Sequence, residues 1–458
     1  MKPVAVIGAG ITGLTAAFYL KRRGVPVTVY EADGRAGGVI RSLRKDGFLA
    51  EYGPNTILET SPKIAQLIRD AGLSSRRLDT DPKASARYVV GRGRPISMPG
   101  SPFGFIGTKL FSPAAKLAVL REPFVKPRRD GVEESIAQFV VRRFNQEFLD
   151  RAVDALVAGV YAGDPYKLSL PHAFPRLKAL EDNYGSMIRG QIFGARDRKR
   201  SGEVARDRAP KLSFDEGLQV LPDTLAKQLG DSLKLNTVVQ RITQTAGGWI
   251  VTTTAGSVKY DQVIYSGTAY RLAGLEIYGG TEGAHPARQI DLSVFSEIRY
   301  PPVTSVVLGF RREEVTHPCL GFGMLIPRSE GFKILGTIFS STLFPNRAPR
   351  DYVTLSNYIG GERCPELALL PTEKIVALVI ADLRTLLGVR GKPVFVHSAT
   401  WPRAIPQYNV GYGKFKEHLS RLELELPGLF FAGHYRDGVS LGDSIVSGVN
   451  IAEKAGAS

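Results

Sequence analysis

The feature that most constrains this chain is the spacing of three glycines near its N-terminus. Gly8, Gly10 and Gly13 form a G-x-G-x-x-G pattern directly after the apolar run Val4 to Ile7. The run is short and rich in β-branched residues, as in a buried strand, and the apolar residues after Gly13 recur with the period of a helix. A strand, a glycine-rich turn and a helix in this order predict a dinucleotide-binding unit with phosphate at the helix N-terminus.

An acidic residue stands where such a unit needs one. Val27 to Tyr30 has the composition of a second strand, and Glu31 follows it directly. A carboxylate at this position accepts hydrogen bonds from an adenosine ribose and repels a ribose 2′-phosphate, so NADP is disfavoured. Three glycines can also do no more than shape a turn, but here the strand, the helix and the acid all stand in the required context.

The residues after Glu31 separate FAD from NAD. Arg35 and the pair Gly37 and Gly38 resemble the extended motif of the amine oxidase and phytoene desaturase class of flavoproteins. An arginine supplies charge for a pyrophosphate, and glycines let the backbone pass close to the ribityl chain. A surface arginine beside a glycine hinge is the plainer alternative. The residues expected to bind FAD here are Gly8, Gly10, Ile11, Thr12, Gly13, Glu31, Arg35, Gly37, Gly38 and Val39.

Three further strings narrow the resemblance. They are Gly53-Pro54-Asn55, the A-G-V-Y-A-G-D string at residues 158–164, and the W-P-x-x-I-P-Q-Y string at residues 401–408. Together with the glycine motif they are similar to the FAD-dependent protoporphyrinogen oxidase family, and the likeness extends over nearly the whole chain. Taken alone, each string would be an ordinary turn or core segment.

The resemblance implies a flavin site built from both ends of the chain. By position, the turn after Tyr52 approaches the isoalloxazine ring, Val239 lies against the adenine, and the segment before Asp443 holds the ring. Asp443 is expected to cap a helix whose N-terminus stabilises negative charge on the reduced flavin. His434 is expected to be a neighbour of FAD and not a base, and no dedicated catalytic residue is expected. The further cofactor residues implied are Gly53, Pro54, Asn55, Thr56, Val239, Trp401, Gly433, His434, Val439, Ser440 and Leu441.

The resemblance also implies a tetrapyrrole pocket in the middle of the chain. Arg87 matches an arginine that contacts a propionate, and a guanidinium suits a carboxylate because two parallel hydrogen bonds can form. Two aliphatic residues would grip one pyrrole ring and Tyr358 would stack on another, while Gly159 would let the flat macrocycle approach the backbone. As plain sequence, most of these are core or sheet residues. The substrate-binding residues implied are Arg87, Gly159, Gly323, Leu325, Ile338 and Tyr358.

The expected fold class is α/β with three parts. A discontinuous Rossmann-type FAD-binding domain alternates along the chain with an α+β substrate-binding domain, whose strand patterns predict a mostly antiparallel sheet. A helical, membrane-associated subdomain is inserted between them. The boundaries are 1–85, 212–270 and 396–458 for the FAD-binding domain, 86–95 and 271–395 for the substrate-binding domain, and 96–211 for the helical subdomain.

The membrane interpretation rests on residues 96–124. Aromatic and aliphatic side chains there stand beside lysines and arginines, which suits contact with a membrane surface from one side. A core-packed loop and helix is an equal alternative from the sequence alone. We expect no membrane-spanning helix, because no apolar run approaches about 20 residues.

The charge balance favours anionic partners. Lys and Arg number 60 against 44 Asp and Glu, which gives a formal charge of +16. The basic tract from Arg189 to Lys211 is expected to be a solvated loop, and nucleic acid is not expected because aromatic residues are not interleaved there. Two cysteines, Cys319 and Cys364, are too few for a disulfide framework or a metal site. They suggest a reducing, cytoplasmic setting, at the membrane face if the segment docks there.

The function implied by the resemblance is oxidation of protoporphyrinogen IX to protoporphyrin IX. Hydride would pass from a saturated ring carbon to FAD, and dioxygen would reoxidise the flavin and yield hydrogen peroxide. Coproporphyrinogen III, with four carboxylates in place of two, is the first alternative substrate. An amine oxidase or carotenoid desaturase, and a non-catalytic tetrapyrrole or lipid carrier that keeps FAD, are further alternatives. The sequence leaves open a homodimer and the electron acceptor used in the cell.

Overall fold

A parallel five-stranded sheet forms the base of the cofactor region. The computed structural model describes residues 2–194, 209–279 and 288–457. The strand order is β10-β2-β1-β14-β22, and every neighbouring pair is parallel. Strands β1, β2, β14 and β22 are mostly buried, as parallel strands covered on both faces require, whereas the short edge strand β10 is partly exposed. Their bounds are β1 (Val4–Ile7), β2 (Val27–Tyr30), β10 (Leu233–Lys234), β14 (Gln262–Tyr265) and β22 (Leu429–Phe431).

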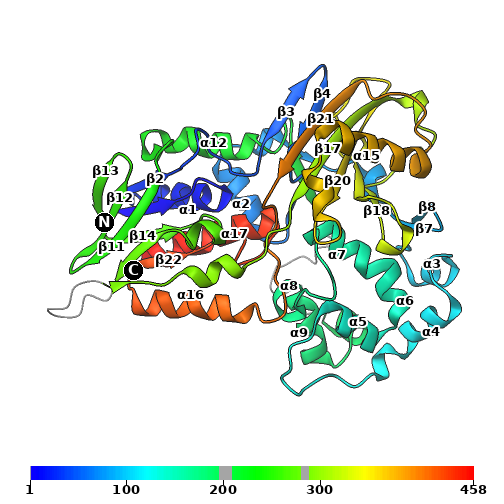
Figure 1. Ribbon diagram of the computed structural model, residues 1–458, viewed down its shortest axis with the longest axis horizontal. Helices are drawn as coiled ribbons and strands as arrows, with labels where there is room; N and C mark the ends of the chain where they lie inside the picture. The colour runs from blue at the N-terminus through cyan, green and yellow to red at the C-terminus, as the bar shows by residue number, and fades with distance from the viewer. Residues whose placement is uncertain (1, 195–208, 280–287, 458) are drawn as a thin grey trace.

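Helices from distant parts of the chain cover this sheet. Helix α1, directly after β1, packs along α17 from the C-terminal end of the chain, and Figure 1 shows the two side by side, blue beside red. The apolar faces of both helices enter one core with β1 and β2. The expected strand, turn and helix are therefore present. The helices around this sheet are α1 (Ile11–Arg22), α2 (Pro62–Asp70), α12 (Val220–Leu229), α13 (Ala269–Leu272), α16 (Gly413–Glu425) and α17 (Leu441–Ala457).

Smaller sheets complete this region. A second five-stranded sheet has the order β13-β12-β11-β15-β16, and two further sheets join β3 to β4 and β5 to β9 and β6. Strand β4 ends one residue before the turn that the sequence assigns to the flavin. The bounds are β3 (Ser42–Lys45), β4 (Phe48–Glu51), β5 (Ile57–Leu58), β6 (Arg77–Asp79), β9 (Lys211–Phe214), β11 (Val239–Thr245), β12 (Gly248–Thr253), β13 (Gly256–Tyr260), β15 (Glu276–Gly279) and β16 (Arg288–Gln289).

A seven-stranded sheet dominates the second region, with the order β21-β17-β20-β19-β18-β7-β8. All neighbours are antiparallel except β18 and β7, so the predicted, mostly antiparallel sheet is confirmed. Helix α15 covers one face with an apolar core, and the other face looks towards the cofactor region. The bounds are β7 (Arg87–Gly91), β8 (Arg94–Ser97), β17 (Val303–Arg311), β18 (Gly323–Leu325), β19 (Ile334–Phe339), β20 (Tyr352–Gly360), β21 (Phe395–Trp401), α14 (Ser340–Leu343) and α15 (Thr372–Leu387).

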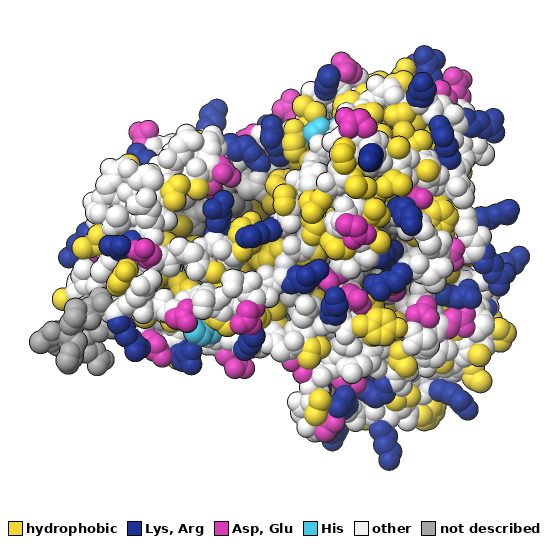
Figure 2. Space-filling model, in the orientation of Figure 1, with side chains coloured by type: hydrophobic (Ala, Val, Ile, Leu, Met, Phe, Trp, Pro, Cys, Tyr) yellow, Lys and Arg dark blue, Asp and Glu magenta, His cyan; other side chains and the backbone are white. Residues whose placement is uncertain are grey.

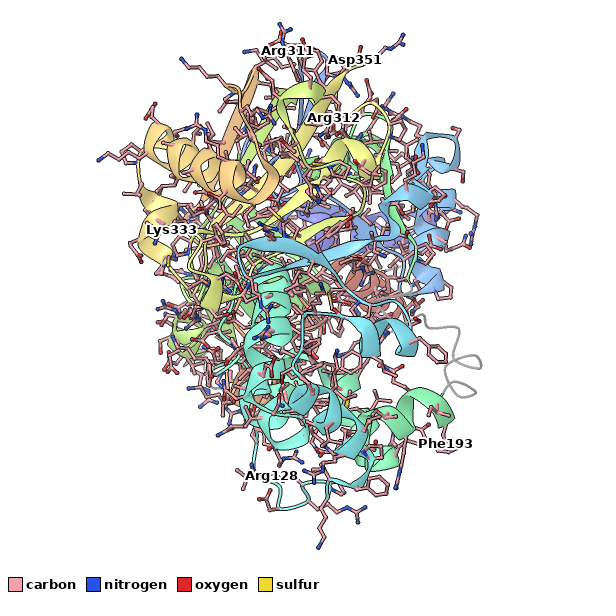
Figure 3. All side chains as sticks on the ribbon, turned by 90° about the vertical axis from the view of Figure 1, so that its right-hand side faces the viewer. Arg128, Phe193, Arg311, Arg312, Lys333 and Asp351 are labelled. Atoms are coloured by element: carbon pink, nitrogen blue, oxygen red, sulfur yellow. The ribbon has the colours of Figure 1, made fainter. Side chains whose placement is uncertain are left out.

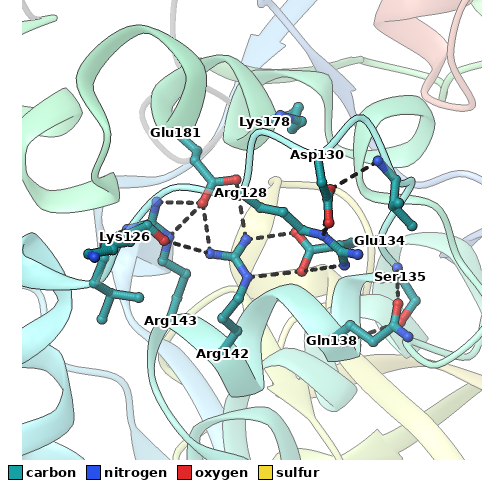
Figure 4. A network of polar contacts seen from close by, with 12 residues as sticks. Lys126, Arg128, Asp130, Glu134, Ser135, Gln138, Arg142, Arg143, Lys178 and Glu181 are labelled. Carbon is teal, nitrogen blue, oxygen red and sulfur yellow. Dashed lines mark hydrogen bonds and ion pairs between the residues drawn. The ribbon is translucent and has the colours of Figure 1, made fainter.

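A helical unit, residues 98–194, follows β8. Arg143 lies at its centre, fully buried, and its guanidinium pairs with the buried carboxylates of Glu122 and Glu181. Arg142 joins Glu181 to Glu134, as Figure 4 shows. This network links the start, middle and end of the unit. Its helices are α3 (Pro102–Gly107), α4 (Pro113–Arg121), α5 (Ile136–Arg143), α6 (Gln146–Phe148), α7 (Asp154–Tyr161), α8 (Leu170–Ala173), α9 (Pro175–Tyr184) and α10 (Met187–Phe193).

The predicted boundaries do not all coincide with element ends. The boundary between residues 395 and 396 falls inside β21, which belongs to the seven-stranded sheet, and the one between 211 and 212 falls inside β9. Most of the predicted basic tract, residues 195–208, lies outside the described residues. None of the described helices is both long enough and apolar enough to cross a bilayer.

Candidate active site

The three glycines of the first motif have three different surroundings. Gly8 has a φ of +101°, which L side chains rarely adopt. A Cβ at Gly13 would overlap the Gly8 carbonyl, so this glycine permits α1 to pack closely on β1. A Cβ at Gly10 would meet no atom within 4 Å, so the space over this residue is open. Ile11 and Thr12 begin the helix there, and its free N–H groups and dipole suit a pyrophosphate.

Glu31 lies at the end of β2, where the sequence places it against an adenosine ribose. Its Oε2 accepts a hydrogen bond from the Ala9 amide at 2.7 Å, so the carboxylate sits beside the glycine turn. The segment leading to Val239 runs alongside, because the Thr237 amide donates to the Glu31 carbonyl at 2.8 Å. The structure thus brings Gly10, Glu31 and Val239 to one edge of the sheet.

Arg35 braces the turn that contains Gly37 and Gly38. Its guanidinium donates to the carbonyls of Ala36, Gly38 and Ile40, and the Gly37 amide donates to the Ala9 carbonyl at 2.8 Å. Gly38 lies against Gly10, since a Cβ on Gly38 would lie 3.5 Å from the Gly10 Cα. Val39, next in the chain, is exposed. Gly10 and Gly38 therefore border the same cradle. The role of Arg35 towards pyrophosphate stays a prediction.

The predicted flavin turn, Gly53 to Thr56, lies between the two large sheets. The Trp401 indole Nε1 donates to the Tyr52 carbonyl at 3.0 Å, which places Trp401 beside Gly53. The Tyr358 hydroxyl, from the same sheet, donates to the Gly53 carbonyl at 2.8 Å, and the Asn55 side-chain amide donates to the Tyr358 hydroxyl. A cavity of about 460 Å³ adjoins Trp401, lined by Tyr270, Arg271, Trp401, Pro402 and Arg403.

The C-terminal segment Gly433 to Leu441 leads into α17, which lies beside the N-terminal glycine motif. The Gly433 amide donates to Ser447 Oγ at 2.9 Å, and Thr12 Oγ1 donates to the Ser444 carbonyl at 3.0 Å, so α17 is bonded to the first motif. Helix α17 begins at Leu441, three residues earlier than a cap at Asp443 implies. Ser440 is therefore the capping residue, since its Oγ accepts from the Asp443 amide, and Asp443 accepts in return from the Ser440 amide. The expected cap at Asp443 is wrong by one helical turn.

His434 is partly buried in this segment. Burial lowers its pKa to about 4, so the imidazole is neutral near pH 7. Its Nε2 lies 3.4 Å from the Tyr300 hydroxyl, and its carbonyl accepts a hydrogen bond from Tyr408. Val439, like Ser440 and Leu441, is partly exposed along the same edge. That His434 is a neighbour of FAD and not a base stays a prediction.

The predicted substrate residues lie on one face of the seven-stranded sheet. The register pairs Ser356, Ile338, Gly323 and Arg87 in one row across four strands. The next row is Tyr358, Gly336, Leu325 and Val89, and residues directly opposite one another share a face. Residues up to 271 positions apart in sequence thus come together beside the flavin turn.

Gly159 lies against Leu325, and its predicted role towards a macrocycle stays a prediction. It lies in α7, which packs on this face, and a Cβ there would overlap the Leu325 side chain. The missing side chain therefore admits Leu325 in this structure. Ala158 and Ala162 form a small apolar cluster with Val303 and Leu335 next to Tyr358. This end of the face is apolar, whereas Arg87 stands at the opposite edge.

Sequence reasoning missed several residues that shape the site. Ser266, at the end of β14, donates to the carbonyls of Ile7 and Gly8 and so holds the glycine turn. Gln407 and Tyr408 belong to a string that was recognised, but the string gave them no role. Polar residues directly after a parallel strand are the signal that could have indicated Ser266. Among the described residues, no group of three or more His, Cys, Asp or Glu side chains could hold a metal ion.

Comparison with known proteins agrees with this geometry. The model of the flavin containing amine oxidoreductase family matches residues 11–455. A protoporphyrinogen oxidase of Arabidopsis thaliana, chloroplastic/mitochondrial, is 37% identical over 99% of this chain and 93% of its own. The chain belongs to the flavin-containing amine oxidoreductases, among the protoporphyrinogen oxidases. It is an FAD-dependent oxidoreductase of that family.

The chain is also similar to two more distant proteins. A coproporphyrinogen III oxidase of Bacillus subtilis is 28% identical over 98% of this chain and 96% of its own. The crystal structure of a protein from Exiguobacterium sp. 255-15 superposes with a TM-score of 0.80 at 22% identity, covering 99% of this chain and 98% of the other. The latter shows a shared fold. The open cradle at Gly10 and Gly38 and the helix N-termini of α1 and α17 fit the FAD of this family.

Proposed function

We propose that this enzyme oxidises protoporphyrinogen IX to protoporphyrin IX. Six electrons and six protons leave the substrate in three two-electron steps, and three molecules of dioxygen take them up as hydrogen peroxide. The observation that carries the proposal is the sheet face on which Arg87, Leu325, Ile338 and Tyr358 lie together beside the turn at Gly53. That arrangement suits a flat, apolar macrocycle with carboxylates at one edge.

Each residue of this face has a distinct task in the proposal. Arg87 binds a propionate through its guanidinium and fixes the orientation of the ring. Leu325 and Ile338 contact one pyrrole, and Tyr358 stacks on another. FAD, when bound, supplies the acceptor for a hydride from a saturated ring carbon. The N-terminus of α17 stabilises the negative charge that this transfer brings to the site, and the proposal needs no side-chain base.

The direct test is an anaerobic titration of the purified holoenzyme with protoporphyrinogen IX. We expect the absorbance of the oxidised flavin to disappear and porphyrin fluorescence to appear, with three flavins reduced per porphyrin formed. On admission of air, the flavin spectrum should return with formation of hydrogen peroxide. A flavin that stays oxidised throughout would contradict the proposal and favour a carrier.

Coproporphyrinogen III is the second candidate, because a coproporphyrinogen III oxidase is 28% identical and the chain carries a charge of +16. This substrate distributes four propionates around the macrocycle. The face of the sheet favours the first candidate, because Arg87 stands at one edge and the apolar cluster near Ala158 at the other. Parallel turnover measurements with both porphyrinogens separate the two, and a clear preference for coproporphyrinogen III would replace the first proposal by the second.

We propose further that the helical unit docks on an anionic membrane surface. Large apolar side chains stand exposed along its outer side, while Leu110, Phe111 and Ala115 are packed in its core. Figure 2 shows hydrophobic side chains and projecting Lys and Arg side chains over the helical unit at its lower right, and Phe193 points outwards in Figure 3. Apolar residues among cations suit one-sided insertion at lipid headgroups. The exposed set is Phe103, Ile106, Leu117, Leu120, Phe124, Ile192 and Phe193.

Co-sedimentation with vesicles tests this docking. The enzyme should sediment with vesicles that contain anionic lipid and less with neutral ones, and high salt should weaken the association. The double variant Phe103→Ser, Phe124→Ser should stay in the supernatant with unchanged flavin absorbance. The matched control is Leu424→Ser, because Leu424 is 82% exposed on α16, away from this unit. Equal loss of binding in the control variant would contradict the proposal.

A further inference from the structure

Two adjacent residues, Gln407 and Tyr408, lie between the helical unit and the segment that closes the flavin site. We call residues 433–440 the flavin loop. Both side chains are buried, with 2% and 1% of their surface exposed. They point to different neighbours, as side chains of successive residues in an extended segment do. Each neighbour belongs to a different half of the proposed active site.

Gln407 contacts the substrate-binding half of the proposed active site. Its side-chain amide donates to the Tyr161 carbonyl at 2.9 Å, at the end of α7, the helix that packs on the substrate face. A Cβ at Gly163 would lie 2.6 Å from the Gln407 Oε1, so the glycine leaves room for the side chain. Gln407 therefore fixes where α7 ends.

Tyr408 contacts the cofactor half. Its hydroxyl donates to the His434 carbonyl and accepts a hydrogen bond from the Gly438 amide at 3.1 Å, so a single oxygen bridges both ends of the flavin loop. Its ring stacks on Tyr412 with centroids 4.3 Å apart. The Tyr412 hydroxyl donates to the Tyr435 carbonyl at 2.6 Å and supports the same loop. The curvature of residues 434–438 thus depends on the Tyr408 hydroxyl.

We propose that Tyr408 and Gln407 are positioning residues that set the flavin and the macrocycle at a fixed distance from each other. Tyr408 acts through the flavin loop and the start of α17, and Gln407 acts through α7. Because each residue holds its own half, loss of one contact should displace that half and leave the other in place. This inference rests on the proposed function, since it assumes that the flavin loop faces FAD and that α7 faces the porphyrinogen.

The key variant is Tyr408→Phe, which keeps the stacked ring and removes only the hydroxyl. We expect the flavin absorption bands and the reduction potential of the bound flavin to shift. We also expect the rate of anaerobic flavin reduction by porphyrinogen to fall about tenfold, as loss of well-placed hydrogen bonds implies. The KM for porphyrinogen should change by less than about twofold, because the pocket face is untouched.

Gln407→Leu should show the opposite pattern. It keeps the volume of the side chain and removes the donor to Tyr161, so we expect a raised KM with unchanged flavin absorption bands and potential. The matched control for a lost buried hydroxyl is Tyr260→Phe, since Tyr260 is 4% exposed and bonds to Tyr30 far from the flavin loop. This control should lower the melting temperature with no change in the flavin spectrum.

Two results would overturn the inference. One is an unchanged flavin spectrum and potential in Tyr408→Phe, and the other is the same kinetic change in Tyr408→Phe and Gln407→Leu. If Tyr408→Phe does not fold, Tyr412→Phe replaces it, since that hydroxyl holds the same loop at Tyr435, and the same spectral shift is expected. The spectrum and potential are measured without substrate. Failure of wild-type enzyme to oxidise porphyrinogen would therefore refute the proposed function separately.

Discussion

Two buried carboxylates, Glu51 in the cofactor region and Glu181 in the helical unit, have pKa values shifted in opposite directions. Glu51, at the end of β4, is buried and accepts from Ser42 Oγ and the Leu218 amide, with Arg347 at 4.0 Å. Burial dominates there and raises its pKa to about 7. Glu181, in the helical unit, is also buried, but hydrogen bonds from Arg142 and Arg143 outweigh its desolvation and lower its pKa. The helical unit thus depends on paired charge, whereas the cofactor region tolerates an incompletely paired one.

The largest effect is expected when the paired charge is broken. Arg143→Met should destabilise the protein by about 3–5 kcal/mol, because it removes the guanidinium from the buried carboxylate of Glu122 and leaves Glu181 with the guanidinium of Arg142. Urea unfolding of the FAD-loaded enzyme measures this change. In the control, Arg350→Met removes the exposed ion pair with Asp351 and should leave the midpoint almost unchanged. Equal effects of the two variants would show that burial of the pair is unimportant.

The contribution of Glu51 to stability should depend on pH with a sign opposite to that of Glu181, because the pKa of Glu51 is raised and that of Glu181 is lowered. The unfolded carboxyl ionises near 4.5 and the folded one near 7, so the folded protein binds more protons between these values. Its contribution to stability therefore falls as the pH rises through this window, by up to about 3 kcal/mol. Glu51→Gln should remove this slope, and the difference in unfolding free energy between wild type and variant, measured from pH 4.5 to 8, checks it. A difference that does not change with pH would contradict the assignment.

Two glycines of the first motif should separate folding from cofactor binding. Gly13→Ala should cost about 1–3 kcal/mol, because the added Cβ overlaps the Gly8 carbonyl. Gly10→Ala meets open space at a φ of −68°, so the apoprotein should keep its stability and lose affinity for FAD. Thermal unfolding of the apoprotein and FAD titration measure the two effects. Full FAD affinity in Gly10→Ala would place the phosphates elsewhere.

The smallest effect is expected from substitution of Arg87, at the start of β7 in the seven-stranded sheet. Arg87→Ala should raise the KM for porphyrinogen about tenfold and lower kcat much less, because a propionate contact is present in ground and transition states alike. Steady-state kinetics with Arg87→Lys as a second variant tests whether charge alone suffices. A defect confined to kcat would argue against an anchoring role.

The two regions also differ in how far the sequence could predict them. Glycine spacing reflects backbone geometry over a few residues, so β1, α1 and the cradle at Gly10 follow from the sequence. The contact between Thr12 and Ser444 joins residues 432 positions apart, and no local pattern indicates it. The same holds for Arg143 with Glu122 and Glu181, because isolated charged residues are usually solvated. The predicted pocket residues came from family resemblance, and only the strand register explains why they share a face.

The contact between α1 and α17 has a consequence for how the enzyme is made. Helix α17 comprises residues 441–457, and its first turn forms one wall of the cradle that begins at Gly8. A nascent chain can fold β1, α1 and β2 early, but it lacks this wall until residues 441–457 have been translated. Retention of FAD would then report that translation has passed α17, since a chain cut before residue 441 has the phosphate turn without this wall.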